Sequence, residues 1–112
     1  MIESSIKNIL KREYPEIRFN MSEYDDYVEL NILVVQYNQR KTGKATQFLE
    51  RLIQLAHQEQ KDIFLTPDDG YAEEDGMKKP QLIKWYKKLG FKNKQKSDFR
   101  SRNTMCYYVD YV

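Results

Sequence analysis

A short cationic turn, placed between an apolar run and an amphipathic pattern, is the segment best suited to chemistry. Residues 34–56 read VVQYNQRKTGKATQFLERLIQLA. A helix N-terminus carries unpaired backbone N–H groups and a partial positive charge, so a small turn before it can surround a phosphate. Gly43 would allow the backbone to approach such a ligand closely. The turn therefore predicts an anion cradle, formed by Arg40, Lys41, Gly43, Lys44, Ala45 and Thr46.

Two common phosphate-binding motifs do not fit this turn. The ATP-type loop needs G-x-x-x-x-G-K-[ST], but Ala45 follows Lys44 and Asn38 stands at the first glycine position. The dinucleotide fingerprint needs three glycines, and the turn has only Gly43. The sequence also has no Cys/His cluster, so we expect no metal site.

The elements that would position the turn follow from hydrophobic periodicity. Helical spacing predicts three helices, over residues 2–10, 48–56 and 80–89. Alternation and turn signals predict five strands, over residues 16–24, 27–35, 62–66, 91–94 and 103–112. In the second strand, one face is predicted to carry Val28, Leu30, Ile32 and Val34.

The resulting order, α-β-β-α-β-α-β-β, predicts the fold class. The central β-α-β unit requires a right-handed crossover and a parallel pair of strands. The outer hairpins imply antiparallel neighbours. We therefore expect an α/β (α+β) protein, with helices packed on the faces of a mixed sheet.

Length and composition favour one small domain spanning residues 1–112. No apolar run approaches the ~20 residues that span a bilayer, and the N-terminus lacks the features of a signal peptide. The single Cys106 cannot form an internal disulfide. A cytoplasmic location and no membrane partner are the expectation.

Charge is distributed unevenly along the chain. Residues 62–75 hold six acidic residues and no Lys or Arg, whereas residues 78–102 hold ten basic residues and one acidic residue. Each segment is either a solvated face or a surface for a ligand of the opposite charge. An acidic segment would suit a cationic substrate, and a basic one would suit a phosphate or a nucleic acid.

Two motifs together resemble a known family. RKTGKA, starting at Arg40, matches [RQ]-x-x-G-x-[GA], and IKWYKKLGFK carries a Tyr-x-x-x-Gly-Phe pattern at Tyr86, Gly90 and Phe91. These are similar to the acetyl-CoA pyrophosphate loop and a later helix of the GCN5-related N-acetyltransferase (GNAT) family. Residues 17–111 follow that family's element order, so the chain resembles a minimal GNAT-like domain. It departs from the family pattern at Tyr37, Lys44 and Lys79.

The resemblance implies direct transfer of an acetyl group from acetyl-CoA to an amine, either a protein lysine or a small cationic amine. It implies that Tyr86 protonates the departing thiolate and that a backbone N–H near Val35 stabilises the oxyanion. Glu29, on the same strand face as Asn31, is the candidate base. The implied cofactor-binding residues are Leu33, Val34, Val35, Arg40, Lys41, Gly43, Lys44, Ala45 and Thr46.

Plainer interpretations stay open at this point. Tyr86 could be a core residue of an amphipathic helix, and Glu29 could be a carboxylate facing solvent. The chain could also be a nucleic-acid- or nucleoprotein-binding module, because aromatic residues are interleaved with the basic residues of the 78–102 segment. A third alternative is a non-catalytic acyltransferase-like scaffold that binds a protein partner.

Overall fold

A five-stranded mixed sheet with strand order β1-β2-β3-β5-β4 forms the centre of the protein. The computed structural model describes residues 5–34, 42–68 and 78–109. The elements in chain order are α1 (Ile6–Glu13), β1 (Arg18–Glu23), β2 (Tyr27–Val34), α3 (Lys44–Glu59), β3 (Asp62–Leu65), α4 (Lys79–Lys88), β4 (Lys92–Asn93) and β5 (Met105–Tyr107). The predicted order of helices and strands and the predicted α/β class are both confirmed.

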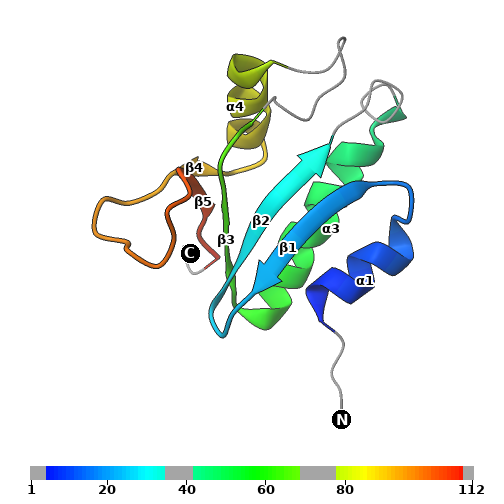
Figure 1. The fold of residues 1–112 in the computed structure, drawn as a ribbon, viewed down its shortest axis with the longest axis horizontal. Helices are drawn as coiled ribbons and strands as arrows, with labels where there is room; N and C mark the ends of the chain where they lie inside the picture. Colours follow the sequence, from blue (N-terminus) through cyan, green and yellow to red (C-terminus); the bar gives the residue numbers. More distant parts are fainter. Residues whose placement is uncertain (1–4, 35–41, 69–77, 110–112) are drawn as a thin grey trace.

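The pairing of the strands also matches the prediction. β1 and β2 form an antiparallel hairpin, and β2 runs parallel to β3, to which α3 connects it. β5 lies between β3 and β4 and is antiparallel to both. Figure 1 shows α1 and α3 beside β1 and β2, and α4 beside the upper end of β3. No helix in the described ranges is long and apolar enough to cross a membrane.

The main core lies between α1, α3 and the sheet. The apolar spacing of residues 48–56 predicts a buried stripe, and this is confirmed for all of its members except the half-buried Ile53: Phe48, Leu49, Leu52, Leu55 and Ala56 are buried. The ring of Phe48 contacts Phe19 at 4.9 Å and Tyr14 at 5.7 Å between ring centroids. Helix α3 therefore joins α1 and β1 through one aromatic cluster, which contributes area burial plus favourable ring geometry.

The N-terminus of α1 is fixed by two side chains. Ser5 accepts a hydrogen bond from the backbone N–H of Asn8 at 3.0 Å, which is ordinary N-capping. Glu23, at the end of β1, accepts from the N–H groups of Ile6 and Lys7 at 3.3 and 3.0 Å. A carboxylate at this position also suits the positive end of the helix dipole. The hydrogen bonds therefore connect the beginning of α1 to the far end of β1.

A bulge at Asn31 interrupts the pairing of β2 with β1. Met21 lies opposite Leu30 and Asn20 lies opposite Ile32, so Asn31 has no partner of its own. One extra residue in a strand reverses the facing of every side chain after it.

Because of the bulge, the side chains of β2 do not all lie on the faces predicted from the sequence. A single face had been predicted for Val28, Leu30, Ile32 and Val34, and this was wrong beyond Leu30. Leu33 instead lies opposite Phe19 and packs against the main core. Ile32 and Val34 turn to the opposite face of the sheet because Asn31 takes up one extra position.

β5 is shorter than the strand predicted for residues 103–112. On either side of β5, backbone N–H groups bond to side chains instead of to a neighbouring strand. The Thr104 N–H donates to Thr66 Oγ1 at 3.1 Å, and the Val109 N–H donates to Asp62 Oδ1 at 2.9 Å. Residues 110–112 lie outside the described part of the chain.

Arg100 organises the face of the sheet opposite α3. Its guanidinium lies 5.1 Å from the ring centroid of Phe64 and 5.5 Å from that of Tyr27. The guanidinium forms ion pairs with three carboxylates, at 3.0 Å from Asp26, 2.7 Å from Asp62 and 2.9 Å from Asp98. These bonds pin the 94–104 segment onto the sheet through charge-assisted contacts.

Acid should weaken the fold through Asp98. Hydrogen bonding from Arg100 lowers the pKa of this carboxyl from 3.8 to about 2, against the opposing effect of burial. A carboxylate with a depressed pKa stabilises the fold above its unfolded pKa, and this stability is lost as the pH falls toward the folded pKa. We therefore expect a loss of about 2 kcal/mol of unfolding free energy between about pH 4 and pH 2 from this group.

Urea unfolding at several pH values would measure this effect. The Asp98→Asn protein should be less stable at neutral pH and should lose less stability on acidification than the wild type. Identical pH slopes for the two proteins would show that Asp98 does not carry the acid sensitivity.

Candidate functional site

β2 and β3 separate after four paired residues. Their pairing runs from Tyr27 opposite Asp62 to Leu30 opposite Leu65, and no later β2–β3 pair forms within the described residues. The bulge at Asn31 lies directly after the last pair. Figure 1 shows the two strands diverging toward α4. Backbone groups on the diverging part of β2 can therefore bond to a ligand in place of β3.

A small cavity lies where the strands part. Its volume is about 20 Å³, enough for one water-sized group. The side chains around it come from β2, from the end of β3 and from α4: Leu30, Asn31, Ile32, Leu33, Leu65, Thr66, Asp68 and Tyr86. Three separate elements thus meet at the point of divergence.

Tyr86 is the ionisable aromatic residue of this cavity. Only 5% of it is exposed, and its ring contacts Trp85 at 5.2 Å and Phe91 at 5.6 Å between centroids. Burial raises the pKa of the phenol above its ordinary value, so it stays protonated at physiological pH. Its hydroxyl has no hydrogen-bond partner among the described residues. A buried hydroxyl without a partner is costly, so a water molecule or a ligand group in the cavity would complete its hydrogen bonding.

Gly90 explains the spacing between Tyr86 and Phe91. The glycine has a φ of 110°, and a Cβ there would lie 2.8 Å from the ring of Tyr107. Both facts exclude an ordinary side chain. The turn brings the N–H of Phe91 back to the carbonyl of Tyr86 at 3.0 Å. The glycine therefore ends α4 and allows the ring of Phe91 to pack against that of Tyr86.

Among the described residues, no side chain caps the N-terminus of α3. Gly43 is the N-cap with a φ of 75°, it supplies no side-chain capping bond, and the first turn holds no acidic residue. A Cβ at Gly43 would meet nothing within 4 Å. The first N–H groups of the helix, those of Lys44, Ala45 and Thr46, lack intrahelical acceptors by helix geometry. This arrangement fits the binding of an anion.

The side chains after Gly43 point to partners within the protein. Lys44 Nζ lies 3.0 Å from Glu16 Oε2, and Thr46 Oγ1 accepts a hydrogen bond from Trp85 Nε1 at 3.1 Å. The second bond joins the first turn of α3 to α4. An anion at this helix end would therefore meet the main-chain N–H groups of these two residues rather than their side chains. The predicted site residues Val35, Arg40 and Lys41 lie outside the described residues.

Glu29 lies on the other side of β2 from the main core and is held by a polar network. It accepts hydrogen bonds from Ser101 Oγ at 2.6 Å and from Asn103 Nδ2 at 3.4 Å. Asn103 Oδ1 in turn accepts from the hydroxyl of Thr66 at 2.8 Å, and Thr66 lines the cavity. The network connects Glu29 to the cavity without placing Glu29 in its wall. Sequence reasoning missed Ser101 and Asn103 because they are more than 70 residues away from Glu29.

The basic 78–102 segment exposes only part of its aromatic residues. Tyr86 and Phe91 are buried, and the indole of Trp85 is bonded to Thr46. Phe99 is 88% exposed, and the half-buried Trp85 lines a hollow with Lys84 and Lys88. Stacking of bases requires accessible ring faces. Tyr86 and Phe91 instead pack α4 against the core.

Cys106 has the environment of a core residue. It is fully buried in β5, and burial raises the pKa of its thiol to about 12. The thiolate is the nucleophilic form of cysteine, so this side chain is inert at neutral pH.

No family model matches the chain, and a search of curated proteins gave no match. Among solved structures, it is similar to the crystal structure of Ard1 from Thermoplasma volcanium. The identity is 17%, the TM-score is 0.49, and the match covers 88% of this chain and 72% of that one. A likeness of this degree carries no functional argument, so the geometry of the chain itself has to supply one.

Proposed function

We propose that the protein is an acetyl-CoA-dependent N-acetyltransferase that transfers an acetyl group directly to an amine. The proposal is carried by the separation of β2 and β3 at Asn31, with the buried Tyr86 beside the gap, whose hydroxyl has no partner among the described residues. The N-terminus of α3, which no described side chain caps, adds a second, anion-binding feature, joined to α4 through Thr46 and Trp85. Coenzyme A suits both features: the amide groups of its pantetheine arm could bond to the free backbone of β2, and its pyrophosphate could bind at the N-terminus of α3.

The cofactor-binding role is proposed for two groups of residues. Backbone groups of Leu33, Val34 and Val35 would bond to the pantetheine arm. The pyrophosphate would be held by Arg40, Lys41, Gly43, Lys44, Ala45 and Thr46, largely through main-chain N–H groups. The φ of 75° by itself favours glycine at position 43, and the space beside the residue is open to a ligand because a Cβ there would meet nothing within 4 Å.

The proposed reaction is a single displacement at the thioester carbonyl. A neutral amine attacks this carbon, a C–N bond forms, the C–S bond breaks and the coenzyme A thiolate leaves. The ammonium first gives one proton to Glu29, directly or through water, and becomes the neutral amine that attacks. As the C–S bond breaks, Tyr86 gives a proton to the thiolate, and the second proton from the nitrogen restores the phenol. A backbone N–H near Val35 would stabilise the oxyanion, a contribution of ~3 kcal/mol by analogy with other oxyanion donors.

The buried phenol is suited to this role for an electrostatic reason. Burial raises the pKa of Tyr86, which keeps it protonated but makes it reluctant to release its proton. A thiolate formed in the same poorly solvated cavity is destabilised too, so its affinity for a proton rises together with that of the phenol. The proton transfer therefore stays feasible as the C–S bond breaks.

The proposed acceptor is a cationic amine before it loses its proton, either a protein lysine or a small polyamine-like molecule. Asp68 supports this choice because it lines the cavity immediately after β3. A carboxylate at this position would attract a cationic substrate to the gap.

Acetyl-CoA should raise the melting temperature of the wild-type protein, because a ligand at 100 times its dissociation constant adds ~2.7 kcal/mol of stability. Gly43→Asn should weaken coenzyme A binding at least ~10-fold in calorimetric titration. Asparagine tolerates a φ of 75° and adds bulk where the pyrophosphate would lie. Valine is less suitable here because a β-branched residue is strained at positive φ.

The matched control is Gln60→Asn, at the other left-handed residue bordering α3, where φ is 55°. It should leave coenzyme A affinity unchanged. Wild-type affinity in a folded Gly43→Asn protein would reject the cradle. If acetyl-CoA neither binds to nor stabilises the wild type, the proposed function fails.

A further inference from the structure

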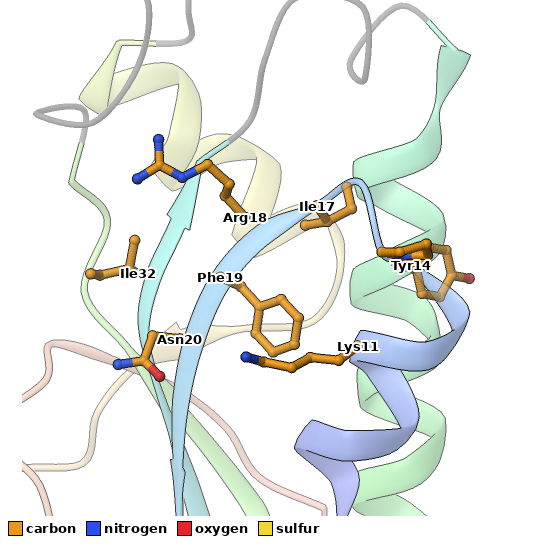
Figure 2. A pocket seen from close by; sticks show the side chains of 8 residues that line it. Lys11, Tyr14, Ile17, Arg18, Phe19, Asn20 and Ile32 are labelled. Atoms are coloured by element: carbon orange, nitrogen blue, oxygen red, sulfur yellow. The ribbon is translucent and has the colours of Figure 1, made fainter.

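A second hollow, with a volume of about 440 Å³, lies beside α1 and β1 and reaches Ile32 of β2, which also lines the cavity at the gap (Figure 2). β1 is the edge strand of the sheet, so its outer side pairs with no other strand in the described residues. The lining includes neighbouring residues whose side chains lie on opposite faces of β1, such as Arg18 and Phe19. A hollow lined from both faces of a strand runs along its free edge.

The unpaired backbone of an edge strand is a template for another strand. The hollow offers apolar contacts beside this edge, because Ile17 is buried and the rings of Tyr14 and Phe19 are half-buried. In Figure 2, Phe19 points into the space between β1 and α1, whereas Arg18 points away from α1. An added strand would therefore meet an apolar side and a cationic side in alternation.

The hollow is also lined by two cationic side chains that have no partner among the described residues. Lys11 and Arg18 are exposed, and neither forms an ion pair or hydrogen bond with any described residue. Neighbouring cations behave differently, since Lys44 pairs with Glu16 and Arg51 pairs with Glu13. Lys11 and Arg18 therefore leave a local excess of positive charge beside the free strand edge.

We propose that the edge of β1 binds an extended acidic segment of another protein, which adds a strand to the sheet. One set of alternate side chains would present carboxylates to Arg18, which favours bidentate contact with such groups. The other set would pack on Phe19, with Lys11 at the rim of the hollow. A free backbone edge requires a partner with N–H and C=O groups, which a peptide supplies. A second copy of this chain would bring the same two cations to the contact and is disfavoured by charge.

The test uses the full chain and a fluorescein-labelled peptide of alternating Glu and Val. Fluorescence anisotropy at low ionic strength should show saturable binding, and NMR should show amide shifts concentrated in Arg18–Glu23. A Lys-Val peptide of equal length and a Glu-Val peptide with N-methylated backbone amides are the controls. Both should bind at least ~10-fold more weakly, since the first has the wrong charge and the second cannot complete a ladder.

Protein variants separate the groove from general charge effects. Arg18→Glu and Lys11→Glu should each lower the peptide affinity ~10-fold, whereas Lys96→Glu, at an exposed cation in the 94–104 segment, should change it little. Equal binding of the N-methylated peptide would overturn the proposal. So would amide shifts outside β1 and α1, absence of binding, or dimerisation of the chain through β1 in sedimentation experiments.

Discussion

Replacing Tyr86 by phenylalanine is expected to lower kcat by ~100-fold, a typical contribution from general acid catalysis. The substitution keeps the ring that packs against Trp85 and Phe91 and removes only a hydroxyl with no partner among the described residues. The Michaelis constant for acetyl-CoA should change little, because the lost interaction forms as the thiolate leaves. The fold should be as stable as the wild type or slightly more stable, since an unpaired buried hydroxyl is removed.

The assay first requires an acceptor, found by testing polyamines and lysine-containing peptides. The control is Tyr107→Phe, at a tyrosine whose hydroxyl is bonded to His57 at 3.0 Å and which does not line the cavity. It should leave kcat near the wild-type value. Wild-type turnover of the Tyr86→Phe enzyme, with chemistry limiting the rate, would remove Tyr86 from the mechanism and leave the cofactor assignment intact.

Replacing Arg100 by methionine should cost about 3–5 kcal/mol of unfolding free energy, the usual effect of removing one partner from a buried ion pair. The side chains of Asp62 and Asp98 are only 15% and 9% exposed, and both would lose their cation. Methionine keeps some of the apolar contact with Phe64. Equilibrium denaturation in urea at neutral pH measures the change.

Arg51→Met is the matched control, because it breaks an ion pair to Glu13 that lies near the surface. Exposed pairs contribute at most ~1 kcal/mol, so its effect should be small. Adding Asp98→Asn to Arg100→Met should recover part of the lost stability by removing one unpaired carboxylate. Equal costs for Arg100→Met and Arg51→Met would contradict a structural role for the Arg100 cluster.

Periodicity was sufficient to predict the order of elements and the mixed sheet, but not the facing of side chains in β2. The stretch from Leu30 to Val35 is apolar at every position except Asn31, so either facing satisfies the pattern. The register with β1 decides between them, and register depends on a partner strand. The bulge that shapes the candidate site therefore could not be predicted from local sequence patterns.

In the candidate site too, features formed by residues close in sequence could be predicted, and features that depend on distant partners could not. Tyr86, Gly90 and Phe91 lie close in sequence, so their motif could be recognised directly. The partners of Arg100 are distant, since Asp26 and Asp62 lie 74 and 38 residues away from it. The sequence assigned Arg100 to a basic segment open to ligands, whereas folding surrounds it with carboxylates. The roles of Val35, Arg40 and Lys41 stay predictions.

The position of β5 between β3 and β4 determines when the sheet can be completed during synthesis. β3 and β4 leave the ribosome before β5 does, yet β4 has no other strand to pair with and β3 lacks its second neighbour until Met105–Tyr107 appear. The side chains of Asp62 and Thr66 likewise lack the hydrogen bonds from the Val109 and Thr104 N–H groups until these residues are synthesised. A nascent chain ending before Met105 would thus expose one edge of β3, a strand whose Ile63, Phe64 and Leu65 are apolar. Such an edge invites aggregation, so the interval before β5 emerges is when this protein most needs a chaperone.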